Sequence, residues 1–349
     1  MLRRVTQPPH IAGPLCLMLT KEKETKKLKI MKKLIFSIIS IILFSCNTSV
    51  NKKTSDSSTE NNAKSYLTEG EHEIEIDGVK LWYLVRGKGP ILIAYPSSAG
   101  WGGDCSVYVE YLKPWEENRT VIYMEPRGLG KSERLDSMRE YSMNKYVEEL
   151  EHFREKLDLK KFDLAGHCYA GIISMKYALK YQQYLNHLIL ISTFPKSGYP
   201  GYYEWLTNRA GYDNMVNRNN EIKKEGLEGE VKLKEEMKSW YTVTFHDYKK
   251  HKENFEKIMD NTVFSTLPVQ QFNTVDNKNY NILDSINQIQ TKTIILYGDE
   301  DFPPVVYGSK DIKEKIPNSK ILEIEKSSHW TFIERPDDFF TETINFLTN

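Results

Sequence analysis

Short apolar runs that alternate with segments of helical spacing are the strongest constraint on the fold of this chain. Runs such as PILIAYP (90–96), HLILIS (187–192) and TKTIILYG (291–298) are almost wholly apolar, as expected for strands buried on both faces. Residues 142–157 instead place their Met, Val, Leu and Phe residues at the spacing of an amphipathic helix. This alternation predicts an α/β domain over residues 66–349, with a mostly parallel sheet covered by helices on both faces.

Two turn signals place elements near the ends of this domain. HEIEIDGVKLWYLVRG (72–87) alternates apolar and polar residues around Asp77-Gly78, which predicts a β-hairpin. At the other end, Pro336 stands where a last helix would begin, and proline is favoured in the first turn of a helix. Both features fit a sheet that starts with an antiparallel hairpin and ends under a helix.

One long segment, from about residue 194 to 283, breaks the alternation of strands and helices. It is rich in Tyr, Trp, Lys and Glu and has few strand-like runs, and residues 221–245 have the pattern of a charged amphipathic helix. We interpret the segment as a helical insertion. It can be a plain insertion with solvated faces, a cap over the functional site, or both.

The first 65 residues lack the pattern of a folded domain. Met31-Lys32-Lys33 is followed by the apolar run 34–45 and by Cys46, which is the order of a signal peptide. LFSC (43–46) resembles a bacterial lipobox, whose cysteine is lipidated, and the run is short for a membrane span. We expect residues 1–30 to be an upstream extension, 31–45 a lipoprotein-type signal peptide and 46–65 a disordered polar tether.

This reading places the protein in the bacterial cell envelope, exported and anchored to the lipid bilayer through Cys46. Because the residues after Cys46 are polar, the tether would hold a folded domain away from the bilayer without fixing its orientation. The alternative is a short apolar membrane anchor that is never cleaved.

Composition argues against several classes of protein. Lys and Arg total 48 and Asp and Glu total 48, so the net charge is zero and gives no reason to expect nucleic acid. The eight histidines show no HExxH motif and the four cysteines no CxxC pair, so we expect neither a metal nor another cofactor. A disulfide between Cys105 and Cys168 stays open. RGLGKSE (127–133) is not a phosphate loop, because that motif needs a glycine five positions before Gly130, where this chain has Glu125.

Chemistry-bearing residues follow the predicted strands. Gly166–Gly171, with the sequence GHCYAG, reads as a sharp turn from strand to helix that holds Cys168 outward at a helix N-terminus, which favours a thiolate. Asp301 follows another strand and His329 the next one. The carboxyl ends of parallel strands meet at one edge of a sheet, so these side chains predict a Cys–His–Asp triad.

Four motifs together resemble the α/β-hydrolase family, specifically its prolyl-aminopeptidase-like branch, over residues 72–349. GHCYAG is similar to that family's Gly-His-Ser-x-Gly-Gly elbow, with Cys168 in place of serine and Ala170 in place of glycine. MEPRGLGKSE resembles its Asp-x-Arg-Gly turn, with Glu125 for aspartate. YGDEDF and SSHWTFIERPDDF resemble its segments for the catalytic acid and histidine, which carry over to Asp301 and His329.

The resemblance also implies an oxyanion hole. The family's loop after the third strand corresponds to YPSSAGWGG (95–103), which carries one backbone N–H donor over to Ser97 and leaves Pro96 where no donor is needed. The N–H of Tyr169 is the second expected donor. With serine replaced by cysteine, the acyl intermediate becomes a thioester.

The expected function is hydrolysis of a small ester, thioester, lactone or N-terminal peptide bond, with a small molecule or a short peptide as substrate. The alternative is a catalytically silent ligand-binding lipoprotein that keeps the hydrolase fold, with Cys168 as an inert thiol. Cys105 reads as structural, and Asp299 and Glu300 are weaker acid candidates than Asp301. Four aromatic residues of the insertion are candidates to line an acyl pocket, and the alternative is that they form the core of the cap. They are Tyr199, Tyr202, Tyr203 and Trp205.

Overall fold

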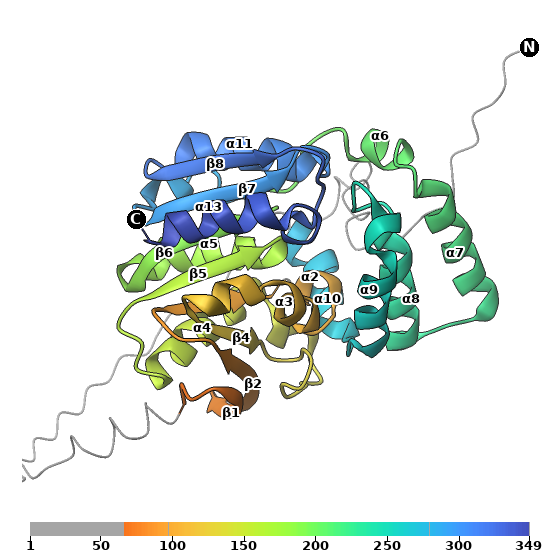
Figure 1. Ribbon diagram of the computed structural model, residues 1–349. Helices are drawn as coiled ribbons and strands as arrows, with labels where there is room; N and C mark the ends of the chain where they lie inside the picture. Colours follow the sequence, from red (N-terminus) through yellow and green to blue (C-terminus); the bar gives the residue numbers. More distant parts are fainter. Residues whose placement is uncertain (1–65, 97, 279, 349) are drawn as a thin grey trace, which may run out of the picture.

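A single eight-stranded sheet forms the centre of the computed structural model, which describes residues 66–96, 98–278 and 280–348 (Figure 1). The strands are β1 (Gly70–Ile76), β2 (Val79–Arg86), β3 (Ile91–Tyr95), β4 (Thr120–Glu125), β5 (Phe162–His167), β6 (Leu185–Ile191), β7 (Lys292–Gly298) and β8 (Ser319–Ile324). Their order is β1-β2-β4-β3-β5-β6-β7-β8. The pairs β1–β2 and β2–β4 are antiparallel and all other pairs are parallel, which confirms the predicted mostly parallel sheet.

The predicted hairpin is present between β1 and β2. Asp77 and Gly78 have φ values of 52° and 75°, and Ile76 pairs directly with Val79. A two-residue turn with both φ values positive matches the right-handed twist of the flanking strands. The Asp-Gly pair therefore sets the register of the antiparallel edge of the sheet.

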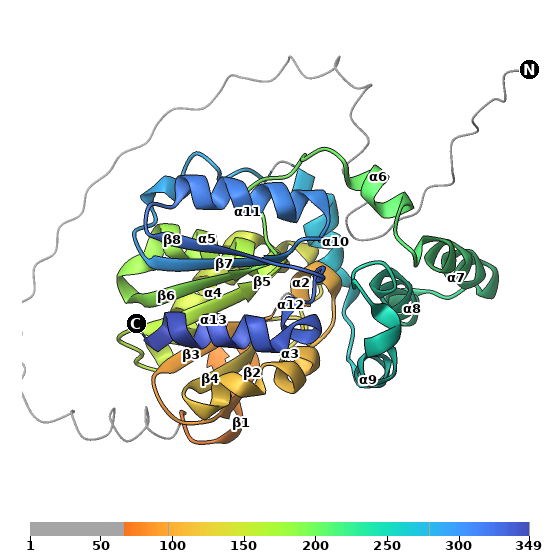
Figure 2. The same cartoon turned by 45° about the horizontal axis from the view of Figure 1, so that its top comes forward.

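Helices cover both faces of the sheet (Figure 2). On one face lie α3 (Ser106–Tyr111), the short helix η2 (Lys113–Glu117) and α13 (Pro336–Thr348). Trp115 joins two of them, because its ring lies 5.7 Å from that of Phe339 and its Nε1 donates to Thr343 Oγ1 at 3.0 Å. On the other face lie α4 (Met143–Lys156), α5 (Tyr169–Tyr181) and α11 (Pro303–Lys315).

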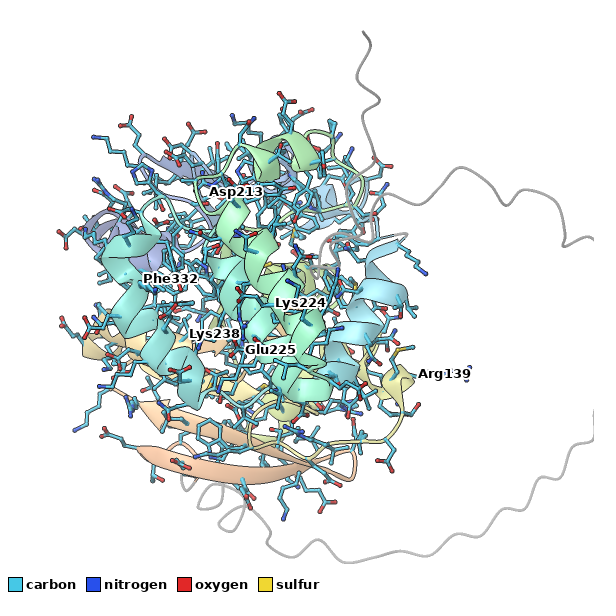
Figure 3. All side chains as sticks on the ribbon, turned by 90° about the vertical axis from the view of Figure 1, so that its right-hand side faces the viewer. Arg139, Asp213, Lys224, Glu225, Lys238 and Phe332 are labelled. Atoms are coloured by element: carbon cyan, nitrogen blue, oxygen red, sulfur yellow. The ribbon has the colours of Figure 1, made fainter. Side chains whose placement is uncertain are left out.

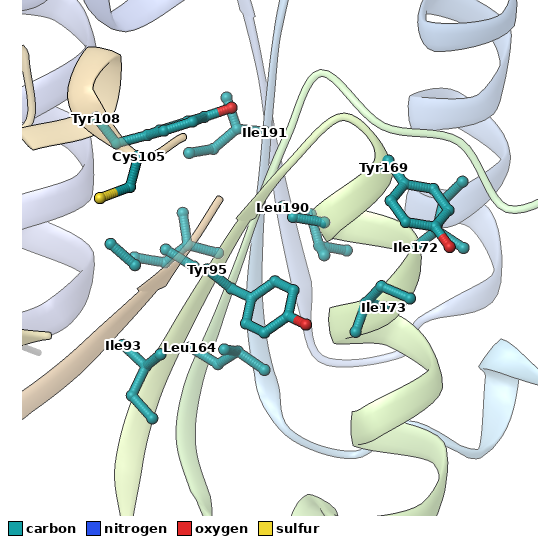
Figure 4. Close-up of a cluster of buried hydrophobic side chains, with 14 of the residues drawn as sticks. Ile93, Tyr95, Cys105, Tyr108, Leu164, Tyr169, Ile172, Ile173, Leu190 and Ile191 are labelled. Atoms are coloured by element: carbon teal, nitrogen blue, oxygen red, sulfur yellow. The ribbon is translucent and has the colours of Figure 1, made fainter. Parts of the chain in front are cut away.

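The core fills both sides of the sheet. Figure 4 shows Tyr108 of α3 on one side of the central strands and Ile172 and Ile173 of α5 on the other. All three side chains are buried, as are Leu164 and Leu190 from the strands between them. This two-sided burial explains why the parallel strands are almost wholly apolar in sequence.

The insertion between β6 and β7 is helical and lies beyond the carboxyl ends of the parallel strands (Figure 1). Its helices are α6 (Tyr202–Thr207), α7 (Tyr212–Glu225), α8 (Gly229–Tyr241), α9 (Tyr248–Asn261) and α10 (Thr266–Thr274). We use the word cap for α6 to α9. The remaining short elements are α2 (Ser98–Trp101), η3 (Met138–Tyr141), η4 (Gln182–Tyr184), η5 (Asp276–Lys278), η6 (Ile286–Gln288) and α12 (Thr331–Glu334).

The prediction of one helix over residues 221–245 is wrong. Gly226 ends α7 in a left-handed conformation with φ 67°, and the N–H of Leu227 donates back to Ile222 O. Gly229, with φ 59°, starts α8. Two glycines in four residues permit a reversal that other residues resist, so the charged segment folds back as two packed helices (Figure 3).

Candidate active site

Cys168 lies at a sharp turn between β5 and α5. Its φ of 53° and ψ of −117° belong to a region that residues other than glycine rarely adopt. Two bonds hold this backbone, since Cys168 N donates to Ile191 O at 2.9 Å and Thr193 Oγ1 donates to Cys168 O at 2.7 Å. The turn places the partly exposed Cys168 side chain directly before the first residue of α5.

Close approach of the backbone explains the small residues around Cys168. A Cβ at Gly166 would lie 2.4 Å from Ser174 Oγ, and one at Gly171 would lie 2.6 Å from Thr193. Both positions therefore need glycine. Ala170, which stands where the related motif has glycine, is fully buried, so the elbow accepts this methyl group.

Asp301 and His329 meet at the ends of β7 and β8. His329 Nδ1 lies 3.0 Å from Asp301 Oδ1 and 3.2 Å from Oδ2, and both side chains are buried. Asp301 Oδ1 also accepts the N–H of Phe302 at 2.8 Å, which fixes the carboxylate. The imidazole makes a second hydrogen bond, to the Cys168 side chain. With Nδ1 on Asp301, the nitrogen that serves Cys168 is Nε2.

The charges around His329 favour its protonated form. Burial alone would lower the pKa of this imidazole, but Asp301 and then Cys168 raise it to about 10. Each raises the pKa because a negative charge beside an imidazole stabilises the imidazolium. The imidazolium form of His329 is therefore favoured at the place where the ring meets the Cys168 side chain.

The two neighbouring carboxylates have other partners. Asp299 Oδ1 accepts the N–H of Ser327 at 3.2 Å. Glu300 contacts the cap, where its Oε2 lies 2.9 Å from Arg209 Nη1 and its Oε1 2.7 Å from His246 Nδ1. Burial would raise the pKa of Glu300, but these two partners hold it below its ordinary value. Of the three acids considered from the sequence, the structure brings Asp301 to His329.

A second buried histidine, to which the sequence analysis assigned no role, holds the main chain of His329. His167 Nε2 lies 2.9 Å from His329 O, and since a carbonyl only accepts, Nε2 donates. Nδ1 then accepts the hydroxyl of Tyr108 at 3.0 Å. Burial, helped by the nearby His329, lowers the pKa of His167 well below its ordinary value, so the ring stays neutral. Its place directly before Cys168 was the available sequence signal.

A buried carboxylate, Glu334, ties the loop that carries His329 to the cap. It accepts the N–H groups of Ser328 at 2.8 Å, His246 at 2.6 Å and Asp247 at 3.2 Å. Burial raises the pKa of Glu334, while these N–H groups act in the opposite direction. The sequence analysis quoted this glutamate within a motif but gave it no role.

The cap also holds the main chain of His329 directly. His329 N donates to Thr244 O at 3.0 Å, and the indole Nε1 of Trp330 donates to Thr244 Oγ1 at 3.2 Å. Thr244 is fully buried in the segment between α8 and α9. The histidine loop and this part of the cap therefore form one packed unit.

A small cavity of about 40 Å³ adjoins the Cys168 side chain. Its lining is mainly aromatic and contains no Asp, Glu, Lys or Arg among the described residues. The lining residues are Gly100, Trp101, His167, Cys168, Met237, Trp240, Tyr241, Phe302, His329 and Trp330. Ligand sites are commonly about 300–1,000 Å³, so this cavity suits a small group.

The structure places the four predicted pocket residues outside this lining. Tyr202 is buried and packs on Trp240, while Trp205 packs on Phe302 and donates from Nε1 to Glu300 O at 3.0 Å. They form a second layer behind the cavity wall. Tyr203 is exposed, and Tyr199 donates its hydroxyl to Asp311 at 2.5 Å, on α11. Of the two roles that the sequence left open for these aromatic residues, the packing of Tyr202 and Trp205 fits cap core.

Of the two expected oxyanion donors, the structure describes Tyr169 but not Ser97. Tyr169 is the first residue of α5, where backbone N–H groups point out of the helix end toward the site of Cys168. Its ring turns into the core and packs 4.4 Å from that of Phe272. Ser97 and the lipidation candidate Cys46 lie outside the described residues, as do 1–65 as a whole.

Cys105 and Cys168 are both free thiols, so the disulfide left open by the sequence is not formed. Cys105 is buried, and burial together with Glu125 and Asp104 raises the pKa of its thiol well above the ordinary value. Among the described residues, no group of three or more His, Cys, Asp or Glu side chains could hold a metal ion.

Several known proteins similar to this chain are named as peptidases or hydrolases. A proline iminopeptidase of Pestalotiopsis fici is 22% identical, over 76% of this chain and 94% of that protein. A proline iminopeptidase of Saccharolobus solfataricus is 24% identical, over 78% of this chain and 90% of that protein. An alpha/beta fold family hydrolase from Bacillus anthracis superposes with a TM-score of 0.64 at 20% identity, covering 79% of this chain and 98% of its own.

Residues 100–336 match the family described as alpha/beta hydrolase fold. This match spans more than half of the 349 residues and includes Cys168, Asp301 and His329. The chain belongs to the α/β-hydrolase family.

Proposed function

We propose that this protein hydrolyses a small, neutral ester, thioester or lactone with Cys168 as the nucleophile. The observation that carries the proposal is the hydrogen-bonded chain from Cys168 through His329 to Asp301. The backbone strain at Cys168 costs folding free energy, and such strain is found mainly at functional sites. A thiol at that place, with a protonated imidazole beside it, is an activated nucleophile.

The proposed reaction has two steps. The thiolate of Cys168 attacks the carbonyl carbon, and the oxyanion accepts the backbone N–H of Tyr169 and, in the proposal, that of Ser97. The bond to the leaving group then breaks as His329 gives it the Nε2 proton, leaving a thioester on Cys168. In the second step His329 takes a proton from water, the hydroxide attacks the thioester, and the acid leaves as the thiolate re-forms.

The cavity favours a neutral substrate over the N-terminus of a peptide. A peptide's α-ammonium group would need a carboxylate or several acceptor groups in the lining. The described lining residues include no acid, and the carboxylates of Asp301 and Glu334 are engaged with His329 and with backbone N–H groups. The names of the two iminopeptidase relatives support the peptide alternative, but their identity of 22–24% is low for carrying over a substrate.

The proposal also includes a lipid anchor at Cys46, in the envelope of a bacterium. It rests on the lipobox-like LFSC sequence and the short apolar run before it. Within the part of the chain that the structure describes, no helix is both long and apolar enough to cross a bilayer. Because Cys46 is the proposed lipid acceptor, replacing it with Ala should move processed protein from the membrane fraction to the soluble fraction. Processed protein that stays with membranes would refute the anchor.

Intact-mass spectrometry after mixing with p-nitrophenyl acetate tests the enzymatic proposal. Wild-type protein should gain one acetyl group at Cys168 transiently and release p-nitrophenolate continuously. Cys168→Ala should gain none, and His329→Ala should acylate and turn over far more slowly. Acylation of Cys168 that ignores His329 would identify a merely accessible thiol, and the silent ligand-binding alternative would then stand.

A further inference from the structure

Two polar groups on the cavity wall have no partner among the described residues. They are the hydroxyl of Tyr241, at the end of α8, and the indole N–H of Trp101, at the end of α2. Both side chains are more than nine-tenths buried, with 3% and 7% of their surface exposed. Buried polar groups are nearly always hydrogen-bonded, so two such groups in one small cavity call for an explanation.

Other polar groups in the same cavity are satisfied. Trp330 is the closest match to Trp101, since it is also a buried indole on the wall, and its Nε1 donates to Thr244 Oγ1 at 3.2 Å. His167 uses both ring nitrogens, one of them with the hydroxyl of Tyr108. The described residues thus supply partners for these groups but none for the Tyr241 hydroxyl or the Trp101 N–H.

Packing prevents both rings from turning to find partners elsewhere. The Tyr241 ring is enclosed edge-on by Trp101 at 5.9 Å, Phe255 at 4.9 Å and Trp330 at 5.4 Å between centroids. Trp101 lies against Phe264, and a Cβ at position 103 would come within 2.1 Å of the Trp101 ring. Gly103 is therefore required for the indole to lie where it does.

The chemistry of the pair defines what it can bind. An indole N–H only donates, and Tyr241 stays protonated, because burial raises the pKa of its hydroxyl well above the ordinary value, with Tyr108 and then Cys168 adding to the effect. Cys168 lines the same cavity as Tyr241 and Trp101. The described lining offers no fixed cation other than His329, which already faces two negative partners.

We propose that Tyr241 and Trp101 form a specificity site that donates hydrogen bonds to an uncharged oxygen in the acyl group of the substrate. The substrate class is a short acyl chain or lactone ring that carries an ether, hydroxyl or keto oxygen close to the scissile carbonyl. This inference rests on the proposed hydrolase function and narrows its substrate. In the proposal the backbone N–H donors bind the oxyanion. Tyr241 and Trp101 therefore recognise the acyl group rather than the reacting carbonyl.

Matched p-nitrophenyl esters test the site. Methoxyacetate is compared with butyrate, and 3-methoxypropionate with pentanoate, because each pair has equal chain length and differs by one oxygen. The quantity measured is the ratio of kcat/KM for the oxygen-bearing ester to that for its partner. The intrinsic reactivity of each ester cancels when a variant's ratio is divided by that of the wild-type protein.

Tyr241→Phe and Trp101→Phe should each lower this ratio about tenfold for at least one pair, which is the effect expected when a neutral hydrogen bond is lost. Tyr248→Phe is the control, since it removes a cap hydroxyl that bonds Glu256 instead, and it should leave the ratio unchanged. A general loss of folding or of catalysis would lower kcat/KM for both esters by the same factor and leave the ratio at its wild-type value. Unchanged ratios for both test variants would overturn the site.

A binding experiment separates failure of this site from failure of the proposed function. In Cys168→Ala protein, tryptophan fluorescence should report tighter binding of 2-methoxyacetamide than of butyramide, because three tryptophans line the cavity. Adding Tyr241→Phe should abolish the preference. If no ester is turned over but this preference is present and depends on Tyr241, the site stands and the hydrolase proposal fails. Turnover without any preference in either experiment contradicts the site alone.

Discussion

The two described cysteines of this protein lie in opposite surroundings. Cys105 is buried before α3, where its N–H donates to Glu125 Oε1 at 3.2 Å and two carboxylates help to raise the pKa of its thiol. Cys168 is partly exposed at the start of α5, where it hydrogen-bonds the imidazole of His329. The sulfur of Cys105 thus lies near two carboxylates, whereas that of Cys168 faces an imidazole whose protonated form is favoured.

The difference shows that a helix N-terminus does not by itself decide a thiol's chemistry, because both cysteines directly precede a helix. The elbow places Cys168 at a helix N-terminus, at the edge of the sheet where the loops after β7 and β8 bring Asp301 and His329. Cys105 instead packs among core side chains beside Glu125, a residue whose own pKa burial raises. Each of the following experiments sets a residue of the Cys168 region against a matched residue outside it.

The largest contrast is expected between the two thiols themselves. Cys168→Ala should lower kcat/KM by at least about a thousandfold with little change in Tm, because the side chain leaves the core at the elbow. Cys105→Ala should keep kcat/KM within about twofold and cost about 1 kcal/mol of unfolding free energy, as a small buried truncation. Ester hydrolysis and thermal melts measure both. Comparable losses of activity in the two variants would contradict the assignment.

The next contrast concerns pH and uses Asp301 and Asp299. A pKa of about 10 for His329 means that the imidazolium is kept below that pH, so kcat/KM should fall as the pH rises through about 10. Because the folded pKa lies above the unfolded one, the associated stability is present below about pH 6.5 and is lost toward pH 10.

Replacing Asp301 with Asn should move this alkaline limb to lower pH and reduce the maximal kcat/KM by about 10²- to 10³-fold. Asp299→Asn should leave the position of the limb unchanged, since its carboxylate bonds the N–H of Ser327. The measurement is the kcat/KM profile from pH 6 to 11 for the three proteins. An alkaline limb that is unaffected by Asp301→Asn would show that Asp301 does not act through His329.

A smaller contrast lies between two carboxylates that join the histidine loop to the cap. Glu334→Gln turns an NH₂ group toward buried N–H donors, so we expect about a tenfold loss of kcat/KM and a lower Tm. Glu300→Gln removes partly exposed ion pairs with Arg209 and His246, which are worth about 0.2–1 kcal/mol, so about a twofold change is expected. Equal effects in the two variants would show that burial of Glu334 is not what positions His329.

Much of the fold, and the meeting of Cys168, Asp301 and His329 at one edge of the sheet, could be predicted from the sequence. Buried parallel strands are continuous apolar runs. Asp77-Gly78 marks the turn between β1 and β2, and Pro336 marks the start of α13, both through local backbone preferences. Cys168, Asp301 and His329 each follow a strand, and parallel strands bring such residues to one edge whatever the details of packing. Local pattern and topology therefore suffice for them.

The cavity wall could not be predicted in the same way. Trp101 comes from α2, whereas Met237 and Tyr241 come from α8, and which of their side chains face Cys168 depends on how the cap packs on the sheet. No local period encodes that packing. Tyr202 and Trp205 were equally plausible by composition, yet they lie one layer behind the wall.

The rate at which iodoacetamide alkylates each thiol tests the central claim most directly. Peptide mapping by mass spectrometry gives separate rates for Cys168 and Cys105 between pH 6 and 9, in wild-type protein and in His329→Ala. Cys168 should react at least about a hundredfold faster than Cys105 at pH 7, and should slow at least about tenfold when His329 is removed. A Cys168 rate that ignores His329 and rises with pH as for a free thiol, with a midpoint near about 8.5, would contradict the account.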